Sequence, residues 1–138
     1  MRAVFIDDYG AVENLRVGEA EVPPVGPHDV RVKVAYAGLR WGDVMARNGL
    51  PSRGRPTPFI GGQEATGVVD AVGEEVHGWS VGDRVMALPQ GGAFAEYVTV
   101  RPGRLMRAPD NVGLDQMLAY PVNMKTAYFM IHTWAKVQ

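Results

Sequence analysis

Histidine is the first residue type in this chain to test for chemistry, because neutral imidazole is the commonest metal ligand in proteins. His28, His77 and His132 stand far apart, in a predicted turn, a predicted surface turn and a predicted helix. None of them belongs to an HxxxH or HExxH spacing, and the chain has no cysteine. The absence of cysteine excludes disulfides, thiolate catalysis and cysteine-ligated zinc. We therefore predict that the chain holds no metal.

Glycine-rich loops that bind phosphate are the second chemical pattern to test. The chain has no G-x-G-x-x-G, and Gly62–Gly67 has the G-x-x-x-x-G spacing without the Lys and Ser or Thr that must follow it. This stretch also opens a predicted strand, so no helix N-terminus would face a phosphate. We interpret its glycines as positions of tight bending and close strand packing. Arg53 and Arg55, in the Pro/Gly-rich loop Leu50–Pro58, are interpreted as solvated charges rather than a phosphate site.

The elements that must position any site are mostly short strands. In Val30–Ala37, apolar Val30, Val32 and Val34 alternate with Arg31 and Lys33, the period of two that is typical of a half-buried strand. Glycine and proline bound the other predicted strands. These are Met1–Ile6, Leu15–Val22, Ala65–Val72, Val85–Leu88, Ala93–Val100 and Arg104–Ala108.

A helical period appears first in Trp41–Arg47. Trp41, Val44 and Met45 fall on one face of this segment, and Asn48-Gly49 supplies a left-handed stop after it. The segment is therefore predicted to be a short helix inserted among the strands.

The end of the chain is also predicted to be helical. Gly113 can cap a helix that Pro121 interrupts and that Val122–Val137 continues, with apolar residues at core spacing. These residues are Ala127, Met130, Ile131 and Trp134. Strands first and helix last predict a mainly β fold: a small, partly open β-barrel with short helices and a C-terminal helical arm.

Length and composition limit the class of protein. At 138 residues the chain fits one domain that buries roughly two-thirds of its unfolded surface. A net charge of −1 with interspersed acids and bases argues against a nucleic-acid or membrane-surface partner. No apolar run reaches the length of about 18 residues that a membrane span needs, and Met1–Asp8 does not resemble a signal peptide. We expect a cytoplasmic location.

Several motifs, in order along the chain, carry a resemblance to a known family. Gly61–Gly73 and Val81–Val85 resemble the G-H-E-x-x-G-x-V-x-x-V-G segment and G-D-R-V turn of the GroES-like N-terminal domain in the medium-chain dehydrogenase/reductase superfamily. Ala37–Asp43, Gly92–Tyr97 and Pro121–Tyr128 are similar to stretches of its quinone oxidoreductases. The resemblance covers essentially the whole chain. It implies one GroES-like catalytic, substrate-side domain over residues 1–138.

Departures from the zinc-dependent members indicate the branch. Zinc alcohol dehydrogenases have a cysteine and a histidine as catalytic ligands where this chain has Arg40 and Gln63, and clustered cysteines that it lacks. The chain therefore resembles zinc-free quinone oxidoreductases, and Met45–Gly49 and Val122-Asn123 are similar to the vesicle amine transport protein homologue group. The resemblance implies NADPH-dependent reduction of quinones or enone-type double bonds by hydride transfer.

The resemblance also assigns roles to four candidate catalytic residues. It places Arg40 near the nicotinamide, where a fixed cation can polarise a carbonyl or hold a cofactor phosphate; a surface arginine at a strand end is the alternative. Asp43 lies nearby, with capping of the helix that begins around Trp41 as the competing role. Gln63 stands at the position of the histidine that binds zinc in the zinc-dependent members, and Glu64 is the next residue. Glu64 is expected to be a buried hydrogen-bond partner of the loops rather than a proton donor.

The cofactor and substrate contacts are likewise implied by family position. Arg40, Asn123 and Thr126 are the candidate cofactor-binding residues, since Asn123 and Thr126 lie three apart on one helical face that approaches the nicotinamide amide and ribose. A flat apolar substrate pocket is expected between three residues for which ordinary core packing is the competing explanation. They are Trp41, Met45 and Leu88.

The nucleotide-binding half of a superfamily member is not in this sequence. A Rossmann strand and its glycine-rich loop are expected soon after Pro121–Tyr128, but the chain stops at Gln138. We therefore expect weak NADPH binding and no activity from this chain alone, with the missing domain and a small quinone or enone as its partners. A stand-alone, non-catalytic binding module and an enoyl reductase domain of a polyketide or fatty acid synthase stay open as alternatives. The reading frame beyond Gln138 would separate them.

Overall fold

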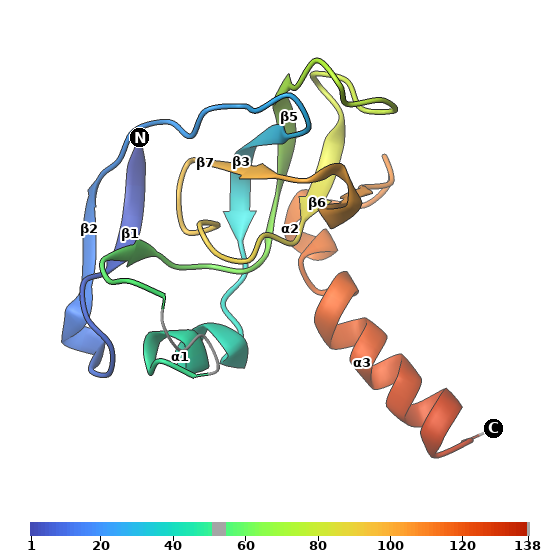
Figure 1. Ribbon diagram of the computed structural model, residues 1–138. Coiled ribbons are helices and arrows are strands. Elements are labelled where there is room, and N and C mark those ends of the chain that lie inside the picture. The colour runs from blue at the N-terminus through green and yellow to red at the C-terminus, as the bar shows by residue number, and fades with distance from the viewer. Residues whose placement is uncertain (51–54, 138) are drawn as a thin grey trace.

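Two antiparallel sheets form the body of the protein, whose computed structural model describes residues 1–50 and 55–137 (Figure 1). The smaller sheet has the order β2-β1-β4, with β1 (Arg2–Ile6), β2 (Leu15–Glu19) and β4 (Phe59–Ile60). The larger has the order β7-β3-β5-β6-β8, with β3 (Val30–Ala37), β5 (Ala65–Val72), β6 (Arg84–Ala87), β7 (Tyr97–Val100) and β8 (Leu105–Arg107). A bridge between Ala3 and Ala95 links the sheets without closing them. The predicted mainly β, partly open architecture is confirmed.

The core lies against the five-stranded sheet because alternate residues of its strands point to one side. Val30 and Val32 of β3 are fully buried, whereas Lys33 between Val32 and Val34 is exposed, as the period of two predicted. They pack with residues of β5, β6, β7 and β8. The other members of this cluster are Val69, Val85, Ala87, Val98, Val100 and Leu105.

The Gly62–Gly67 stretch leads into a strand, as its interpretation as a packing segment requires. β5 begins at Ala65 and pairs along its length with β3, where Gly67 lies opposite Val34 at an irregularity in the register. A Cβ on Gly67 would overlap the carbonyl oxygen of Lys33 on the neighbouring strand. This glycine therefore serves close strand packing, and the stretch has no helix N-terminus to offer a phosphate.

Helix α1 (Trp41–Arg47) has the bounds that its apolar period predicted. The backbone N–H of Leu50 donates to the carbonyl of Met45, and Gly49 has a φ of +77°. Only glycine adopts this left-handed conformation without steric cost, so the predicted stop is confirmed.

Several predicted strand bounds are wrong, each because a partner strand ends or changes. β2 stops at Glu19 rather than Val22, since Glu19 already pairs with Arg2 at the start of β1. β7 begins at Tyr97 rather than Ala93, because the preceding residues cross to the other sheet, where Val4 donates to the carbonyl of Phe94. β6 and β8 shift or shorten by one residue at each end, and the two-residue strand β4 was not predicted. In the predicted loop Leu50–Pro58, residues 51–54, including Arg53, lie outside the described residues.

The C-terminal arm is helical as predicted, but its apolar face is not core. It comprises α2 (Leu114–Met117), a π-helical turn at Tyr120–Met124, α3 (Lys125–Tyr128) and a second π-helical turn at Phe129–Trp134. Met117 is buried against the sheet through α2, and the rest of the arm then runs away from the barrel (Figure 1). The predicted core residues Ala127, Met130, Ile131 and Trp134 are consequently exposed, Trp134 to 80%.

Candidate functional site

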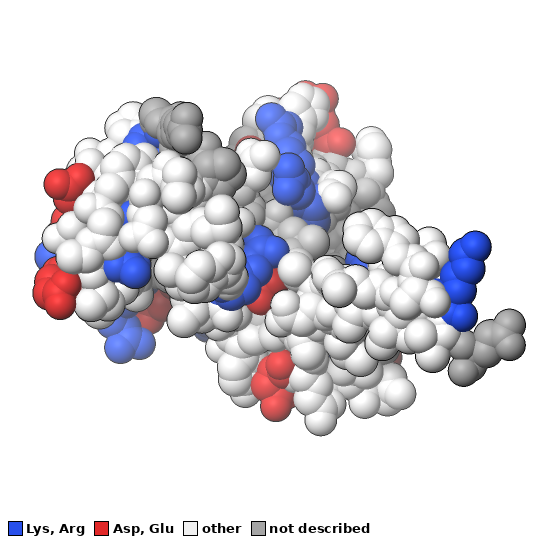
Figure 2. All heavy atoms as spheres, turned by 90° about the horizontal axis from the view of Figure 1, so that it is seen from below, with Lys and Arg blue, Asp and Glu red and all other residues white. Residues whose placement is uncertain are grey.

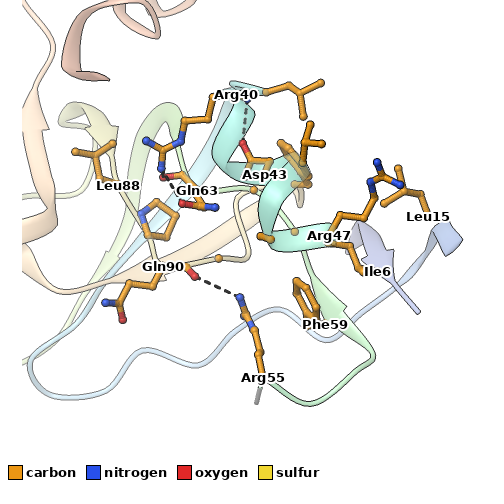
Figure 3. Close-up of a pocket in the computed structure, with 18 of the residues that line it drawn as sticks. Ile6, Leu15, Arg40, Asp43, Arg47, Arg55, Phe59, Gln63, Leu88 and Gln90 are labelled. Carbon is orange, nitrogen blue, oxygen red and sulfur yellow. Dashed lines mark hydrogen bonds between the residues drawn. The ribbon is translucent and has the colours of Figure 1, made fainter. Parts of the chain in front are cut away.

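A cleft of about 560 Å³ opens beside α1 and the loop that joins β4 to β5. This volume falls in the range of roughly 300–1,000 Å³ that is typical of small-molecule sites. Ile6, Phe59 and Leu88 form apolar walls, while Arg40 and Gln63 form a polar end (Figure 3). The cleft is thus apolar with a few convergent polar groups, the usual lining of a ligand site.

Arg40 and Gln63 meet in this cleft, although 22 residues separate them in the chain. The Nη2 of Arg40 donates to the side-chain oxygen of Gln63 at 3.0 Å (Figure 3). The Nε2 of Gln63 in turn donates to the carbonyl of Gly42 at 3.0 Å, which fixes the orientation of the amide. Arg40 is therefore a held, partly buried cation rather than a free surface arginine.

Asp43 caps the helix, the role that competed with a catalytic one. It is 5% exposed, and its Oδ2 accepts the backbone N–H of Arg40 at 3.0 Å. Among the described residues its Oδ1 has no hydrogen-bond partner. Burial raises the pKa of Asp43, while the hydrogen bond and charge of Arg40 oppose the rise.

Glu64 lies behind Arg40 and is 3% exposed. Its Oε2 is 3.9 Å from the Nε of Arg40, and neither atom has a hydrogen-bond partner in the described part of the chain, so Glu64 is buried as expected but the expected hydrogen bond to the loops is not found there. The side chain packs so closely on Gly38 that a Cβ there would overlap it. Burial raises the pKa of Glu64; the Arg40 charge opposes this and the Asp43 carboxylate adds to it. One cation thus lies among two buried carboxyl groups.

The predicted substrate and cofactor contacts are only partly brought together. Leu88 lines the cleft, whereas Trp41 is 74% exposed and neither it nor Met45 is among the lining residues. Asn123 and Thr126 are exposed on the C-terminal arm, which reaches the cleft through Val122. Thr126 instead lines a separate shallow hollow on the arm with Phe129 and Trp134. Contacts of Asn123 and Thr126 with a cofactor stay predictions.

Three further arginines line the same cleft and were missed as site residues. They are Arg47, Arg55 and Arg104. Arg55, interpreted as a solvated charge, is partly buried: its guanidinium lies 4.5 Å from the Phe59 ring centroid and donates to the carbonyl of Gln90 at 3.3 Å. Their positions in the sequence share no spacing, so no motif could have connected them.

The histidines lie away from the cleft, His28 in its predicted turn, His132 on the predicted helical arm and His77 in the connection between β5 and β6. His28 is in a turn with its Nδ1 3.4 Å from Glu75, and His77 and His132 are exposed. Across residues 1–50 and 55–137, no three His, Asp or Glu side chains are grouped so as to hold a metal ion. In the same residues, no helix combines the length and apolar character that crossing a bilayer requires.

Residues 26–110 match the alcohol dehydrogenase GroES-like domain family. The chain belongs to this family. The resemblance drawn from the motifs is thereby confirmed, and the two sheets are consistent with the GroES-like fold.

Curated relatives extend the similarity over the whole chain. The mouse synaptic vesicle membrane protein VAT-1 homolog-like is 33% identical over 138 residues, which is 100% of this chain and 33% of that protein. The probable quinone oxidoreductase of Schizosaccharomyces pombe is 36% identical over 129 residues, 93% of this chain and 39% of that protein. The chain therefore spans a third or slightly more of the length of these relatives.

Solved structures agree with the same assignment. The human VAT-1 homolog-like protein has a TM-score of 0.91 at 33% identity, and the match covers 100% of this chain and 45% of the human one. A mycobacterial protein complexed with NADPH has a TM-score of 0.86 at 29% identity, over 100% and 43% of the two chains. The enoyl reductase JamJ has a TM-score of 0.83 at 27% identity, over 99% and 44%. The relatives of this chain thus include a probable quinone oxidoreductase and an enoyl reductase beside proteins named for the synaptic vesicle membrane.

Proposed function

We propose that this chain is the substrate-side domain of a zinc-independent, NAD(P)H-dependent reductase of quinones or enone-type double bonds. Its relatives include a probable quinone oxidoreductase and a protein complexed with NADPH. The single observation that carries the proposal is the hydrogen bond between Arg40 and Gln63 at the polar end of an apolar cleft. A cytoplasmic location stays a prediction from the sequence.

The donor set at this end does not fit zinc. Structural and catalytic zinc is bound by thiolate, neutral imidazole and carboxylate, and a guanidinium cannot ligate a cation. Arg40 occupies the space between Gln63 and Glu64, so a metal ion there would meet a fixed positive charge. Arg40 is instead suited to the task that a metal would perform, which is to hold negative charge on a substrate oxygen.

The chemistry then rests on positioning and on charge stabilisation. The nicotinamide cofactor, when bound, supplies a hydride to the β-carbon of the conjugated carbonyl substrate. The displaced electron pair moves to the carbonyl oxygen, where the Arg40 guanidinium stabilises it before a proton from water completes the reduction. Gln63 acts as the positioning residue that aims Arg40, and Asp43 fixes the N-terminus of α1 that bears it. Arg40, Asn123 and Thr126 are the proposed cofactor contacts.

The test measures NADPH oxidation by the protein, with any sequence that adjoins this chain, on a panel of quinones and enones. We expect turnover that falls by roughly 100-fold in kcat for Arg40→Lys, because a lysine keeps the charge but cannot fork between Gln63 and the substrate. Arg2→Gln is the matched control, since Arg2 is an exposed arginine paired with Glu96 outside the cleft. Metal analysis and a strong chelator test the zinc-independence directly. Turnover lost to the chelator, or no turnover on the whole panel, would refute the proposal.

Reduction of an enoyl thioester is the second candidate function, favoured by the similarity to the JamJ enoyl reductase. Both functions use the same hydride transfer and differ in the group that carries the double bond. The ratio of kcat/KM for a crotonyl thioester and for a simple quinone separates them. The quinone or free enone proposal requires that the thioester is not the preferred substrate.

A further inference from the structure

The cleft carries an excess of positive charge that the reduction of a neutral quinone does not need. Four guanidinium groups line it, those of Arg40, Arg47, Arg55 and Arg104. Asp43 is the acidic residue among its lining residues in the described part of the chain. Figure 2 shows Lys and Arg side chains gathered along the hollow in the middle of this face. Such a charge balance attracts anions.

Of the arginines away from Arg40, Arg47 and Arg55 are held by neutral groups rather than by carboxylates. Arg47 donates to the carbonyl of Gly10, and Arg55 donates to the carbonyl of Gln90 while its guanidinium lies over Phe59. Within residues 1–50 and 55–137, the ion pairs do not include Arg47, Arg55 or Arg104. These contacts position Arg47 and Arg55 and leave their charge uncompensated, and the charge of the exposed Arg104 is likewise unpaired among the described residues.

The neighbouring acids are already engaged elsewhere. Asp29 borders the adjacent hollow that Arg55 and Arg104 also line, but it pairs with Arg101 at 3.3 Å. Glu64 is buried behind Arg40 at the opposite end. Residues 51–54, which precede Arg55, contain no acid in the sequence. The end of the cleft that Arg55 and Arg104 line, called the basic end below, therefore has positive charge available for a ligand.

Apolar side chains separate the end of the cleft that holds Arg40 from the basic end that holds Arg55. In Figure 3, Arg40 and Gln63 lie at one end of the cleft and Arg55 at the other, with Leu88 and Phe59 along the sides. A ligand that uses both ends must have a reactive polar head, an apolar body and a negatively charged group at its far end. Charge-assisted hydrogen bonds from arginine suit a carboxylate or a phosphate monoester in particular.

We propose that the cleft selects acidic substrates, in which the conjugated carbonyl lies at Arg40 and a carboxylate or phosphate is held by Arg55 and Arg104. This inference rests on the proposed function for the nature of the head group. The charge selection itself is a property of the cleft and can be measured without turnover.

The experiment compares a medium-chain enone that ends in a carboxylate with its methyl ester, by calorimetry on the protein as it is expressed from its reading frame. We expect the acid to bind roughly tenfold more tightly than the ester, and this preference to shrink at high salt. The double variant Arg55→Gln/Arg104→Gln is expected to bind both equally. A phosphate monoester of the same length tells which anion is preferred. Arg2→Gln, which removes one exposed charge elsewhere, should keep the preference.

Two arms make the result decisive. Equal binding of acid and ester, no binding of either, or a preference that survives in the double variant would overturn the proposal. A preference that disappears when NADPH is saturating would also overturn it, because the arginines would then be occupied by a cofactor phosphate rather than by the substrate. Turnover is recorded separately on the same proteins. Selective binding without reduction would sustain the acidic ligand while refuting the reductase function.

Discussion

The two ends of the cleft hold their arginines in opposite ways. At the buried end, Arg40 is hydrogen-bonded to Gln63 and lies among the carboxyl groups of Asp43 and Glu64. At the basic end, Arg55 lies over Phe59 and, among the described residues, its guanidinium donates to one carbonyl oxygen, that of Gln90, while Arg104 is exposed. The buried charges compensate one another, so folding should depend on them. The basic charges are left for a ligand, so binding should depend on them while folding should not.

The largest expected effect breaks the compensation at the buried end. Arg40→Gln leaves the Asp43 and Glu64 carboxyl groups without their cation, and removing one partner of a buried ion pair is strongly destabilising because a charge stays buried and unpaired. We expect the free energy of unfolding to fall by about 3 kcal/mol. Urea unfolding at pH 7 measures it, beside Arg2→Gln, which should change it by no more than about 0.5 kcal/mol. Equal losses in the two variants would mean that the buried cluster is not a structural unit.

A backbone change at the same end should have the next largest effect. Gly62 precedes Gln63 and has a φ of +89°. A Cβ added at this position would lie 2.5 Å from the backbone nitrogen of Phe94. Gly62→Ala is therefore expected to cost about 2 kcal/mol through strain and overlap. Gly103→Ala is the matched control, because a Cβ there meets no atom within 4 Å. Thermal unfolding of both variants measures the difference, and similar melting temperatures would contradict the expectation.

A pH dependence should sharpen the comparison with a smaller effect. Burial raises the pKa of Glu64 above its unfolded value, so its contribution to stability is fully present below the unfolded pKa and is lost as the pH rises through the folded one. Glu64→Gln removes this loss. The free energy of unfolding of the variant, minus that of the unchanged protein, should therefore increase as the pH rises above about 4.5. This difference should become constant above the folded pKa of Glu64.

Urea unfolding between pH 5 and 8 checks this sign. Asp43 shifts in the same direction and stays in both proteins, so the difference reports Glu64 together with its electrostatic coupling to Asp43. A difference that shrinks with rising pH would show that the attraction of Arg40, rather than burial, dominates at Glu64.

Much of the fold could be predicted because its cause is local. The alternation from Val30 to Val34 predicted β3, and Asn48-Gly49 predicted the end of α1, since both depend on neighbouring residues alone. The strand β4 was missed because it has only two residues and exists through its pairing with β1. The apolar face of the C-terminal arm, which includes Trp134, was wrongly assigned to the core for a related reason. An apolar period indicates that a helix face is suited to burial, but it does not identify the surface that covers this face.

The site divides along the same line. Arg40 and Gln63 could be singled out from the sequence because a family motif stands at each of them, and the hydrogen bond between them is compatible with that assignment. Arg47 lies in the Met45–Gly49 stretch, but no spacing connects it with Arg104, which belongs to no motif, and only the folding of distant loops onto one cleft brings them together. Charge gathered in space from scattered positions is invisible to spacing rules. The basic end could therefore be identified only from the structure.

The smallest expected effect on stability is at this basic end, and it completes the comparison. Arg55→Gln/Arg104→Gln removes two charges that no carboxylate of the described residues compensates, and gives up chiefly the contact of Arg55 with the Phe59 ring. We expect a loss of about 0.5 kcal/mol, the value of an exposed cation–π contact, which relief of like-charge repulsion should further reduce at low salt. Urea unfolding at low and high salt measures it. A loss as large as that of Arg40→Gln would show that the basic end, too, is built for folding, and would remove the reason to assign its charge to a ligand.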